Sequence, residues 1–335
     1  SIDSDSVRVQ VVATDLAGNS DQDASDANLT IDSTPPNGTV TITEGNYTTN
    51  PEIHLLLNAP DDTTRMYLDG DLLDAPHVRH WITYTTTATG TLTPGEGSKT
   101  VSVRYRDGAG NEGDLATDAI IYDVTPPTMA HNTPAEGSTV TTGTPVISAT
   151  LSDVTSGIDS ATITMTVDGN PVAPAFDQGS GVVSYTPGPA LSNTSHVVAL
   201  GARDRAGNGA FWAWSFWVNE PPAWVLLEVY PATLVADGVS TATITVTATS
   251  LSGYPVADGT QVVFSTTLGT LDGGAVYTTT TQGGVATAVL TAPERAGTAV
   301  IRVRVGAEGA IEEVRFIEMA PPQQRIYLPI VLKNY

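Results

Sequence analysis

The sequence predicts an all-β protein, an elongated array of tandem β-sandwiches, and three observations support that prediction. Its 335 residues are dominated by Thr, Val, Ala, Gly, Ser and Pro, a composition that favours strands and turns over helices. Short stretches alternate apolar and polar residues, as Val7, Val9 and Val11 do, and this is the period of a half-buried strand. Two motifs recur in step at intervals of about 90 to 100 residues, the length of one small sandwich domain.

The first recurring motif predicts a β-hairpin. DLAGN at residues 15–19 returns as DGAGN at 107–111 and as DRAGN at 204–208. Each copy follows an alternating strand, and its Gly-Asn pair supplies the positive φ that a tight turn needs. Another alternating strand comes next, with Leu29 and Ile31 in the first copy. Each motif therefore indicates the last hairpin of one sandwich.

The second recurring motif marks the linkers. DSTPP at 32–36 matches DVTPP at 123–127, and Pro-Pro steps return at 221–222 and 321–322. Proline ends strand pairing because it has no N–H to donate, and two in a row stiffen a joint. We therefore predict immunoglobulin-like sandwiches of about seven strands. The expected boundaries are a partial domain 1 at 1–33, domain 2 at 34–124, domain 3 at 125–222, domain 4 at 223–320 and a tail at 321–335.

Over residues 1 to about 220, the two motifs together resemble the bacterial immunoglobulin-like repeats of large surface adhesins. Domain 4 instead resembles the invasin/intimin type of domain, through YPA at 230–232, GTQVVF at 259–264 and GTL at 269–271. The tail at 325–334 is similar to an ending found in secreted proteins of the Chloroflexus group. The resemblance implies an extracellular, cell-surface location.

Charge and composition exclude several classes of function. The formal net charge is −22, whereas nucleic-acid binding needs a basic surface and an anionic membrane would repel an acidic one. The chain has no cysteine and no apolar run long enough to span a bilayer. It also lacks a nucleophile elbow, a zinc-protease helix motif and a phosphate-binding glycine loop, so we predict that it is not an enzyme.

The two ends of the chain carry apolar strand patterns without a domain of their own. Domain 1 has only its last hairpin, and the tail adds one more alternating strand, which is an aggregation hazard unless something covers it. Three explanations remain open: a piece of a longer chain with its tail folded back, head-to-tail assembly through the terminal strands, or a tail recognised in secretion. The candidate assembly residues are Val7, Val9, Val11, Leu29, Ile31, Ile326, Leu328, Ile330 and Leu332.

Calcium is the one cofactor that the resemblance implies. Linker carboxylates in related adhesins bind calcium, and by that likeness Asp15 with Asp32, or Asp107 with Asp123, would form junction sites. Asp153 and Asp159 are further candidates from the sequence. The competing explanation is that a hairpin aspartate accepts hydrogen bonds from its own turn.

Two other clusters are prominent in the sequence. Asp69, Asp71, Asp74, His77 and His80 are dense in metal-ligand types, although Asp69-Gly70 is also a simple hairpin turn. The run FWAWSFW at 211–217 places Trp212, Trp214 and Phe216 on one strand face, expected in the core. The candidates for a sugar platform or an interdomain contact are Phe211, Trp217 and Trp224.

The function that the sequence favours is mechanical. We predict an extracellular structural protein of a bacterial surface assembly, a filament, sheath or stalk, that associates head to tail with copies of itself. The alternatives are a non-catalytic stalk of a larger secreted adhesin or enzyme, and a carbohydrate-binding surface module with glycans as partners.

Overall fold

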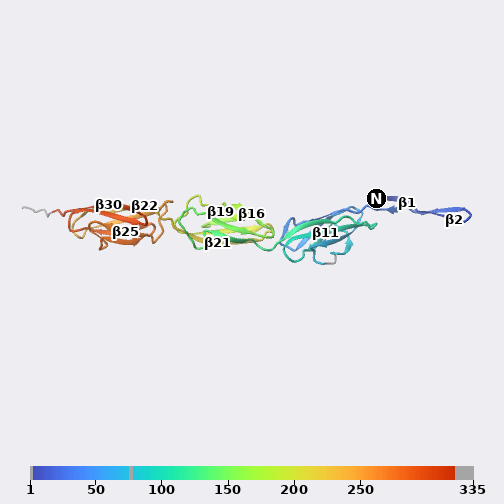
Figure 1. Cartoon of the computed structure of the whole chain (residues 1–335), viewed down its shortest axis with the longest axis horizontal. Helices are drawn as coiled ribbons and strands as arrows, with labels where there is room; N and C mark the ends of the chain where they lie inside the picture. Colours follow the sequence, from blue (N-terminus) through green and yellow to red (C-terminus); the bar gives the residue numbers. More distant parts are fainter. Residues whose placement is uncertain (1–2, 75–77, 321–335) are drawn as a thin grey trace, which may run out of the picture.

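The structure, a computed structural model, describes residues 3–74 and 78–320, and these form four blocks in a line (Figure 1). The described residues contain 30 β-strands and no helix, as the all-β prediction requires. Among them there is accordingly no helix long and apolar enough to cross a membrane. The linear arrangement follows from the sequence, because each of domains 2 to 4 has its own core and short proline linkers separate the blocks.

Domain 2 is a sandwich of a three-stranded and a five-stranded sheet. The first has the order β10-β7-β5 and the second β6-β12-β11-β8-β9. All pairs are antiparallel except β6 with β12, which run parallel. The strands are β5 (Thr39–Ile42), β6 (Tyr47–Thr48), β7 (Glu52–Asn58), β8 (Thr63–Gly70), β9 (Trp81–Thr83), β10 (Thr87–Thr91), β11 (Gly97–Asp107) and β12 (Ala116–Tyr122).

Domain 3 repeats this plan with one strand more. Its sheets have the orders β13-β15-β19-β18 and β14-β21-β20-β16-β17, and β14 runs parallel to β21. The strands are β13 (Thr128–Thr133), β14 (Thr139–Val140), β15 (Ile147–Ser152), β16 (Ile158–Val167), β17 (Asn170–Val172), β18 (Ala175–Asp177), β19 (Val182–Tyr185), β20 (Ser195–Asp204) and β21 (Gly209–Val218).

Domain 4 has the same two-sheet plan in spite of its different motifs. The orders are β22-β24-β28-β26 and β23-β30-β29-β25-β27, with β23 parallel to β30. The strands are β22 (Pro222–Tyr230), β23 (Thr233–Val235), β24 (Thr241–Ser250), β25 (Gln261–Thr266), β26 (Thr270–Leu271), β27 (Val276–Thr280), β28 (Val285–Thr291), β29 (Gly297–Val305) and β30 (Glu308–Ile317).

The alternation seen in the sequence decides which side chains form the cores. On β11, Val101, Val103 and Tyr105 are completely buried between the two sheets of domain 2. On β21, Trp214 and Phe216 are buried in the core of domain 3, with Trp212 packed against it. The predicted core face of the aromatic run is therefore the observed one.

Domain 1 is a hairpin that extends from the array at its blue end (Figure 1). The strands pair as β1 with β4 and β2 with β3, and they have no second sheet among the described residues. Its apolar side chains Val9, Val11, Leu29 and Ile31 are therefore exposed. The strands are β1 (Ser4–Val7), β2 (Gln10–Thr14), β3 (Ser20–Ala24) and β4 (Leu29–Ile31).

Candidate functional site: the joints between domains

A hydrogen bond of the same kind links neighbouring domains at the first two joints. The linker residue Asp32 follows β4, and its backbone oxygen accepts from Asn111 Nδ2 of domain 2 at 3.1 Å. Asp123 follows β12, and its backbone oxygen accepts from Asn208 Nδ2 of domain 3 at 3.0 Å. The last hairpin of each domain thus reaches back to the end of the domain before it.

The hairpin aspartate shapes the turn that places this amide. Asp107 Oδ1 accepts from the backbone N–H of Gly110 at 2.7 Å and of Asn111 at 2.8 Å, while Oδ2 accepts from Asn111 Nδ2 at 2.7 Å. Asp204 makes the equivalent three contacts with its own turn. Gly110 has a φ of 98°, the left-handed conformation that glycine adopts without strain. Asp107 and Asp204 therefore accept hydrogen bonds from their own hairpin turns.

Besides these contacts within the turn, the carboxylates of Asp107 and Asp204 each lie close to two other carboxylates. Oxygens of Asp32, Asp62 and Asp107 lie within 4.8 Å of one another, and those of Asp123, Asp153 and Asp204 do the same. Asp62 lies between β7 and β8, and Asp153 between β15 and β16, so each cluster combines one linker and two loops of the following domain. Asp107, Asp123 and Asp204 are at most 2% exposed.

Burial and hydrogen bonding act in opposite directions on the pKa of Asp107. Burial raises the pKa of Asp107, but hydrogen bonds from Asn111 and Gly110 outweigh it and hold that pKa below its usual value. The carboxylate is therefore charged at neutral pH despite its burial. Carboxylates that lie this close together repel one another when ionised, and a divalent cation bound between them would relieve that repulsion.

The observed pairing differs from the expected one. The resemblance to adhesins predicts a junction site from Asp15 with Asp32, or from Asp107 with Asp123. In the structure Asp32 lies beside Asp107, and Asp123 beside Asp204. The reason is that the hairpin turn and the end of its second strand are at opposite ends of a domain, roughly 40 Å apart for about a dozen extended residues.

Membership of the two carboxylate clusters differs from the sequence prediction at three aspartates. Asp15 accepts from Asn19 within its own turn, at 2.9 Å, and belongs to neither cluster. Asp159 accepts from Ala161 and is likewise outside them. Asp62 was missed, although its spacing of about 90 residues from Asp153 matches the period of the motifs.

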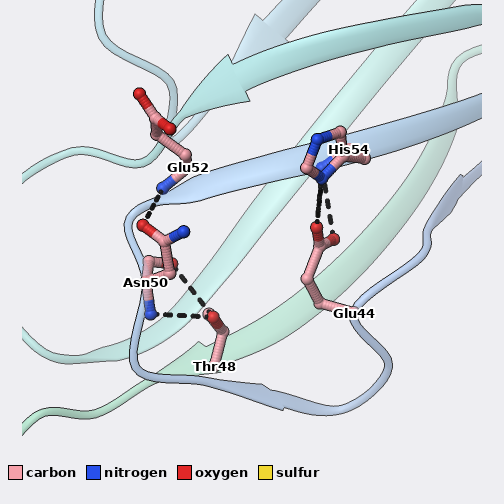
Figure 2. A network of polar contacts seen from close by, with 5 residues as sticks. All are labelled: Glu44, Thr48, Asn50, Glu52 and His54. Carbon is pink, nitrogen blue, oxygen red and sulfur yellow. Dashed lines mark hydrogen bonds and ion pairs between the residues drawn. The ribbon is translucent and has the colours of Figure 1, made fainter.

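A small polar network supports the second joint from the side of domain 2 (Figure 2). Thr48 Oγ1 accepts from Asn50 N at 2.9 Å, and Asn50 Oδ1 accepts from Glu52 N at 3.0 Å. The network fixes the turn after β6, and the backbone oxygen of Thr48 then accepts from Asp123 N at 3.0 Å. Nearby, Glu44 pairs with His54 Nδ1 at 2.7 Å.

The third joint, between domains 3 and 4, has a different design. The linker residue Glu220 is 8% exposed, and its carboxylate accepts from Gly143 N at 2.7 Å and from Ser252 Oγ at 3.0 Å. Its backbone N–H donates to Asn193 Oδ1, and Asn193 Nδ2 donates to Pro255 O across the joint. Neutral donors from both domains therefore satisfy one carboxylate.

The acidity of Glu220 reflects this environment. Burial raises the pKa of its carboxyl, but hydrogen bonds from Gly143 and Ser252 outweigh burial, and the pKa is lowered overall. Among the residues that the structure describes, no cluster of three carboxylates forms at this joint.

The aromatic candidates do not form one platform. Phe211, Trp217 and Trp224 are 70%, 53% and 64% exposed. Phe211 and Trp217 are six residues apart on β21, roughly 20 Å, which is more than one sugar ring spans. Trp224 is on β22 of domain 4, and within the described part of the chain none of the three stacks on another ring.

The acidic cluster in domain 2 is organised by an arginine. Arg79 Nε donates to Asp69 Oδ1 at 3.1 Å, and Arg79 Nη1 lies 3.9 Å from Asp74 Oδ1. The guanidinium thus lies where the sequence suggested a metal, and Asp71 accepts from Thr100 N instead. His77 lies outside the described residues.

The assembly candidates divide into two groups. Val9, Val11 and Leu29 are 51%, 63% and 46% exposed. Val101 and Val103, at the same distances from Asp107 as Val9 and Val11 are from Asp15, are fully buried, and so is Ile120, which precedes Asp123 as Leu29 precedes Asp32. Ile31 is also exposed at 43%, and Val7 is partly buried. The remaining candidates, Ile326, Leu328, Ile330 and Leu332, lie outside the described residues.

Comparison with known proteins supports the predicted resemblance for domain 4. The sequence model of the family described as invasin, domain 3, matches residues 223–319. No curated protein sequence matches the chain.

Several solved structures are similar in fold. A tetra-tandem repeat from the extending region of a large adhesion protein is 19% identical, covering 92% of this chain and 81% of that one, with a TM-score of 0.44. FdeC, an adhesin of Escherichia coli, is 15% identical over 87% of this chain and 100% of its own, with a TM-score of 0.36. An I-band fragment of titin is 12% identical over 86% and 99%, with a TM-score of 0.48. Residues 223–319 thus match the sequence model of invasin domain 3, in a chain whose fold is a row of immunoglobulin-like domains.

Proposed function

We propose that the chain is a rigid spacer, the stalk of an extracellular adhesin-type protein on a bacterial surface. The observation that carries the proposal is the repeated joint, in which Asn111 and Asn208 bind the linker carbonyls of Asp32 and Asp123. A rod transmits position and force only if its joints are fixed, and here each joint has a specific contact between neighbouring domains. The role needs no catalytic group, and it also fits the stalk of a larger secreted adhesin or enzyme.

Calcium is the second element of the proposal. At the first two joints, carboxylates from both sides of the linker lie within 4.8 Å of one another. Calcium takes six to eight oxygen ligands, with carboxylates, backbone carbonyls and water as the usual donors. A bound ion would connect the linker to two loops of the next domain and stiffen the joint.

The test is small-angle scattering and calorimetry in calcium and in EDTA. We expect calcium to raise the melting temperature and to narrow the distribution of end-to-end distances. At a calcium concentration of about 100 times Kd, the stabilisation is about 2.7 kcal/mol for a single site. Asp153→Asn should abolish most of the effect at the second joint, and Asp159→Asn, which changes an aspartate outside that cluster, should leave it intact. Identical curves in calcium and EDTA would remove calcium from the proposal.

Assembly through domain 1 is a second candidate function. The exposed Val9, Val11 and Leu29 correspond to Val101, Val103 and Ile120, which belong to the core of domain 2. A sheet with such an apolar face is stabilised when a second sheet covers that face. We infer that strands from outside the described residues complete this sandwich, and that the tail of a second copy, through Ile326, Leu328, Ile330 and Leu332, supplies one of them.

Sedimentation velocity over a range of protein concentrations separates assembly from a single rod. Head-to-tail pairing predicts species that grow with concentration, because a heterologous contact that does not close generates filaments. Val11→Lys should return the chain to a monomer, whereas Val12→Lys, at a neighbouring exposed position on the other face, should change less. A monomer at every concentration would leave the rod alone as the function.

A further inference from the structure

Domain 3 contains a buried histidine whose two ring nitrogens both face hydrogen-bond acceptors. His196 is on β20, and its side chain is 3% exposed. Its Nδ1 lies 2.7 Å from Oδ2 of Asp168, and its Nε2 lies 2.8 Å from the backbone oxygen of Ser192. Phe216 of β21 packs beside the ring, with ring centroids 5.8 Å apart. Water therefore has little access to either nitrogen.

The two contacts determine how many protons the ring carries. A backbone carbonyl oxygen and an ionised carboxylate only accept hydrogen bonds. A neutral imidazole has one N–H and can donate to only one of these oxygens, whereas an imidazolium donates to both. A flip of the ring does not change this count, because it would place carbon atoms against both oxygens. The observed geometry is thus that of the doubly protonated ring, paired with Asp168.

A tight turn directs the carboxylate at the ring. Asp168 lies between β16 and β17 with a φ of 52°, and Gly169 follows with a φ of 76°. Asp168 Oδ1 accepts from the backbone N–H of Val197 at 2.9 Å, which leaves Oδ2 for His196. The other groups against the ring are the phenyl ring of β21 and a backbone carbonyl of the loop before β20. Among the described residues, Asp168 is the one charged group within ion-pair distance of the imidazole.

The loop that His196 contacts is part of the third joint. Ser192 provides the carbonyl that faces Nε2, and the next residue, Asn193, connects the two domains. Asn193 Oδ1 accepts from the backbone N–H of Glu220 at 2.7 Å, and its Nδ2 donates to the backbone oxygen of Pro255 at 2.9 Å. The imidazole therefore fixes, from inside domain 3, a loop whose outer side chain binds both the linker and domain 4.

We propose that protonation of His196 regulates the rigidity of the third joint. With two protons the ring holds both Asp168 and Ser192, and Asn193 is kept in place. When one proton leaves for water, the remaining N–H stays on the side of the carboxylate, because a charged acceptor is the stronger one. Ser192 then loses its contact with the ring, and the loop is less firmly held. This inference rests on the proposed rod with fixed joints and adds a means of regulating one of them.

The direction of the pH dependence follows from these contacts. Imidazole side chains change their charge between about pH 5 and 8. The doubly protonated ring makes its two contacts only in the folded chain, so they stabilise the joint at the acidic end of this range and are lost as pH rises. Glu220 remains ionised throughout, because hydrogen bonds hold the pKa of its carboxyl below the usual value. The third joint should therefore become less rigid as pH rises from about 5.5 to 8.

Nuclear magnetic resonance of the whole chain tests the proton count. Nitrogen chemical shifts distinguish protonated from unprotonated ring nitrogens, and the signals missing in His196→Gln identify this ring. We expect both nitrogens to be protonated at about pH 5.5, although burial by itself favours the neutral ring. As pH rises, Nε2 should lose its proton while Nδ1 keeps its own. A ring that is neutral at the lower pH, or that loses the Nδ1 proton first, would overturn the proposal.

A distance measurement between domains 3 and 4 tests the joint. The chain has no cysteine, so one can be placed at the exposed Ser160 of domain 3 and one at the exposed Thr287 of domain 4 as sites for spin labels. Pulsed electron paramagnetic resonance then gives the distribution of distances between the labels. We expect a narrow distribution at about pH 5.5 and a broader one at about pH 8.

Variants of the two partners separate regulation from a merely structural role. His196→Gln should give a distribution that does not change with pH, because glutamine has no charge to lose. Asp168→Asn should stay narrow at about pH 8, because its side-chain N–H can donate to Nδ1 of a neutral ring, whose proton is then free for Ser192. Asp177→Asn is the matched control, since Asp177 accepts only within its own exposed turn and should leave the pH dependence intact.

The outcomes distinguish this proposal from the rod itself. A wild-type distribution that is narrow at both pH values would overturn regulation by His196 and leave the rod standing. One that is broad at both values would overturn both. A pH dependence that persists in His196→Gln, or a broad distribution of Asp168→Asn at the higher pH, would also overturn the inference. Because the Asp168 side chain is 41% exposed, the second variant keeps the test decisive if the first one does not fold.

Discussion

The side-chain amide of Asn208 donates to the backbone oxygen of Asp123 at 3.0 Å, and so joins the last hairpin of domain 3 to the end of domain 2. The same amide also donates to Asp204 at 2.7 Å. One residue therefore closes the hairpin turn and fixes the joint. Asn111 does the same for Asp32 and Asp107 one repeat earlier, so the joint is a repeated feature of the array.

Asn208→Ala should loosen the second joint. It removes both contacts and leaves Asp204 Oδ2 without that donor, at a cost of about 1–3 kcal/mol. We expect a lower melting temperature and a broader distribution of end-to-end distances in small-angle scattering. Asn170→Ala is the matched control, since Asn170 makes only a 3.4 Å contact within its own exposed turn. Equal effects of the two variants would show that the joint does not depend on Asn208.

The third joint should weaken in acid. The pKa of Glu220 is lowered in the folded chain, so this carboxylate contributes stability above the ordinary glutamate pKa of about 4.3. That contribution is lost as pH falls through the folded pKa, because protonation removes the negative charge that strengthens the hydrogen bonds to this carboxylate. Glu220→Gln should therefore be less stable than the wild type at pH 7 and should approach it as pH falls below about 4.3 in thermal unfolding experiments. A difference between the two proteins that does not change with pH would contradict this role.

Adjacent aromatic residues of β21 should differ sharply in their effect on stability. Phe216 is completely buried, so Phe216→Ala should cost about 3–5 kcal/mol through lost burial and the cavity left behind. Trp217 is 53% exposed on the opposite face, and Trp217→Ala should stay within about 0.5 kcal/mol. Urea denaturation monitored by circular dichroism measures both. A large loss from Trp217→Ala would instead reveal an interface at that face.

Alanine substitutions at two glycines of domain 3 can distinguish the cost of backbone strain from the cost of a steric clash. Gly181 has a φ of 71°, and a Cβ there would clash with the backbone oxygen of Leu151. Gly169 has a similar φ of 76° but no atom within 4 Å of its Cβ position. Both alanine variants bear the cost of positive φ, of order 1–3 kcal/mol. Gly181→Ala should lose more stability, and equal losses in urea denaturation would refute the steric argument.

Local structure could be predicted from the amino-acid order alone. Val101, Val103 and Tyr105 alternate with polar residues, and alternation with period two assigns side chains to the two faces of a strand whatever the strand packs against. The Gly-Asn pairs set the turns in the same way, because glycine adopts positive φ without strain wherever it stands in the fold. The recurrence of both motifs then predicted a row of sandwiches, and the sequence of residues 223–319 matches the model described as invasin, domain 3.

Contacts between residues that are distant in the chain required the folded arrangement. Asp32 lies beside Asp107 and not beside Asp15, because an extended hairpin carries its turn and its end to opposite ends of a domain. Arg79 lies among the aspartates that the sequence offered as possible metal ligands, because the chain after β8 brings it against Asp69. The contact of His196 with Asp168 exists because strand register sets β20 beside β16, and no local pattern in the sequence encodes that register.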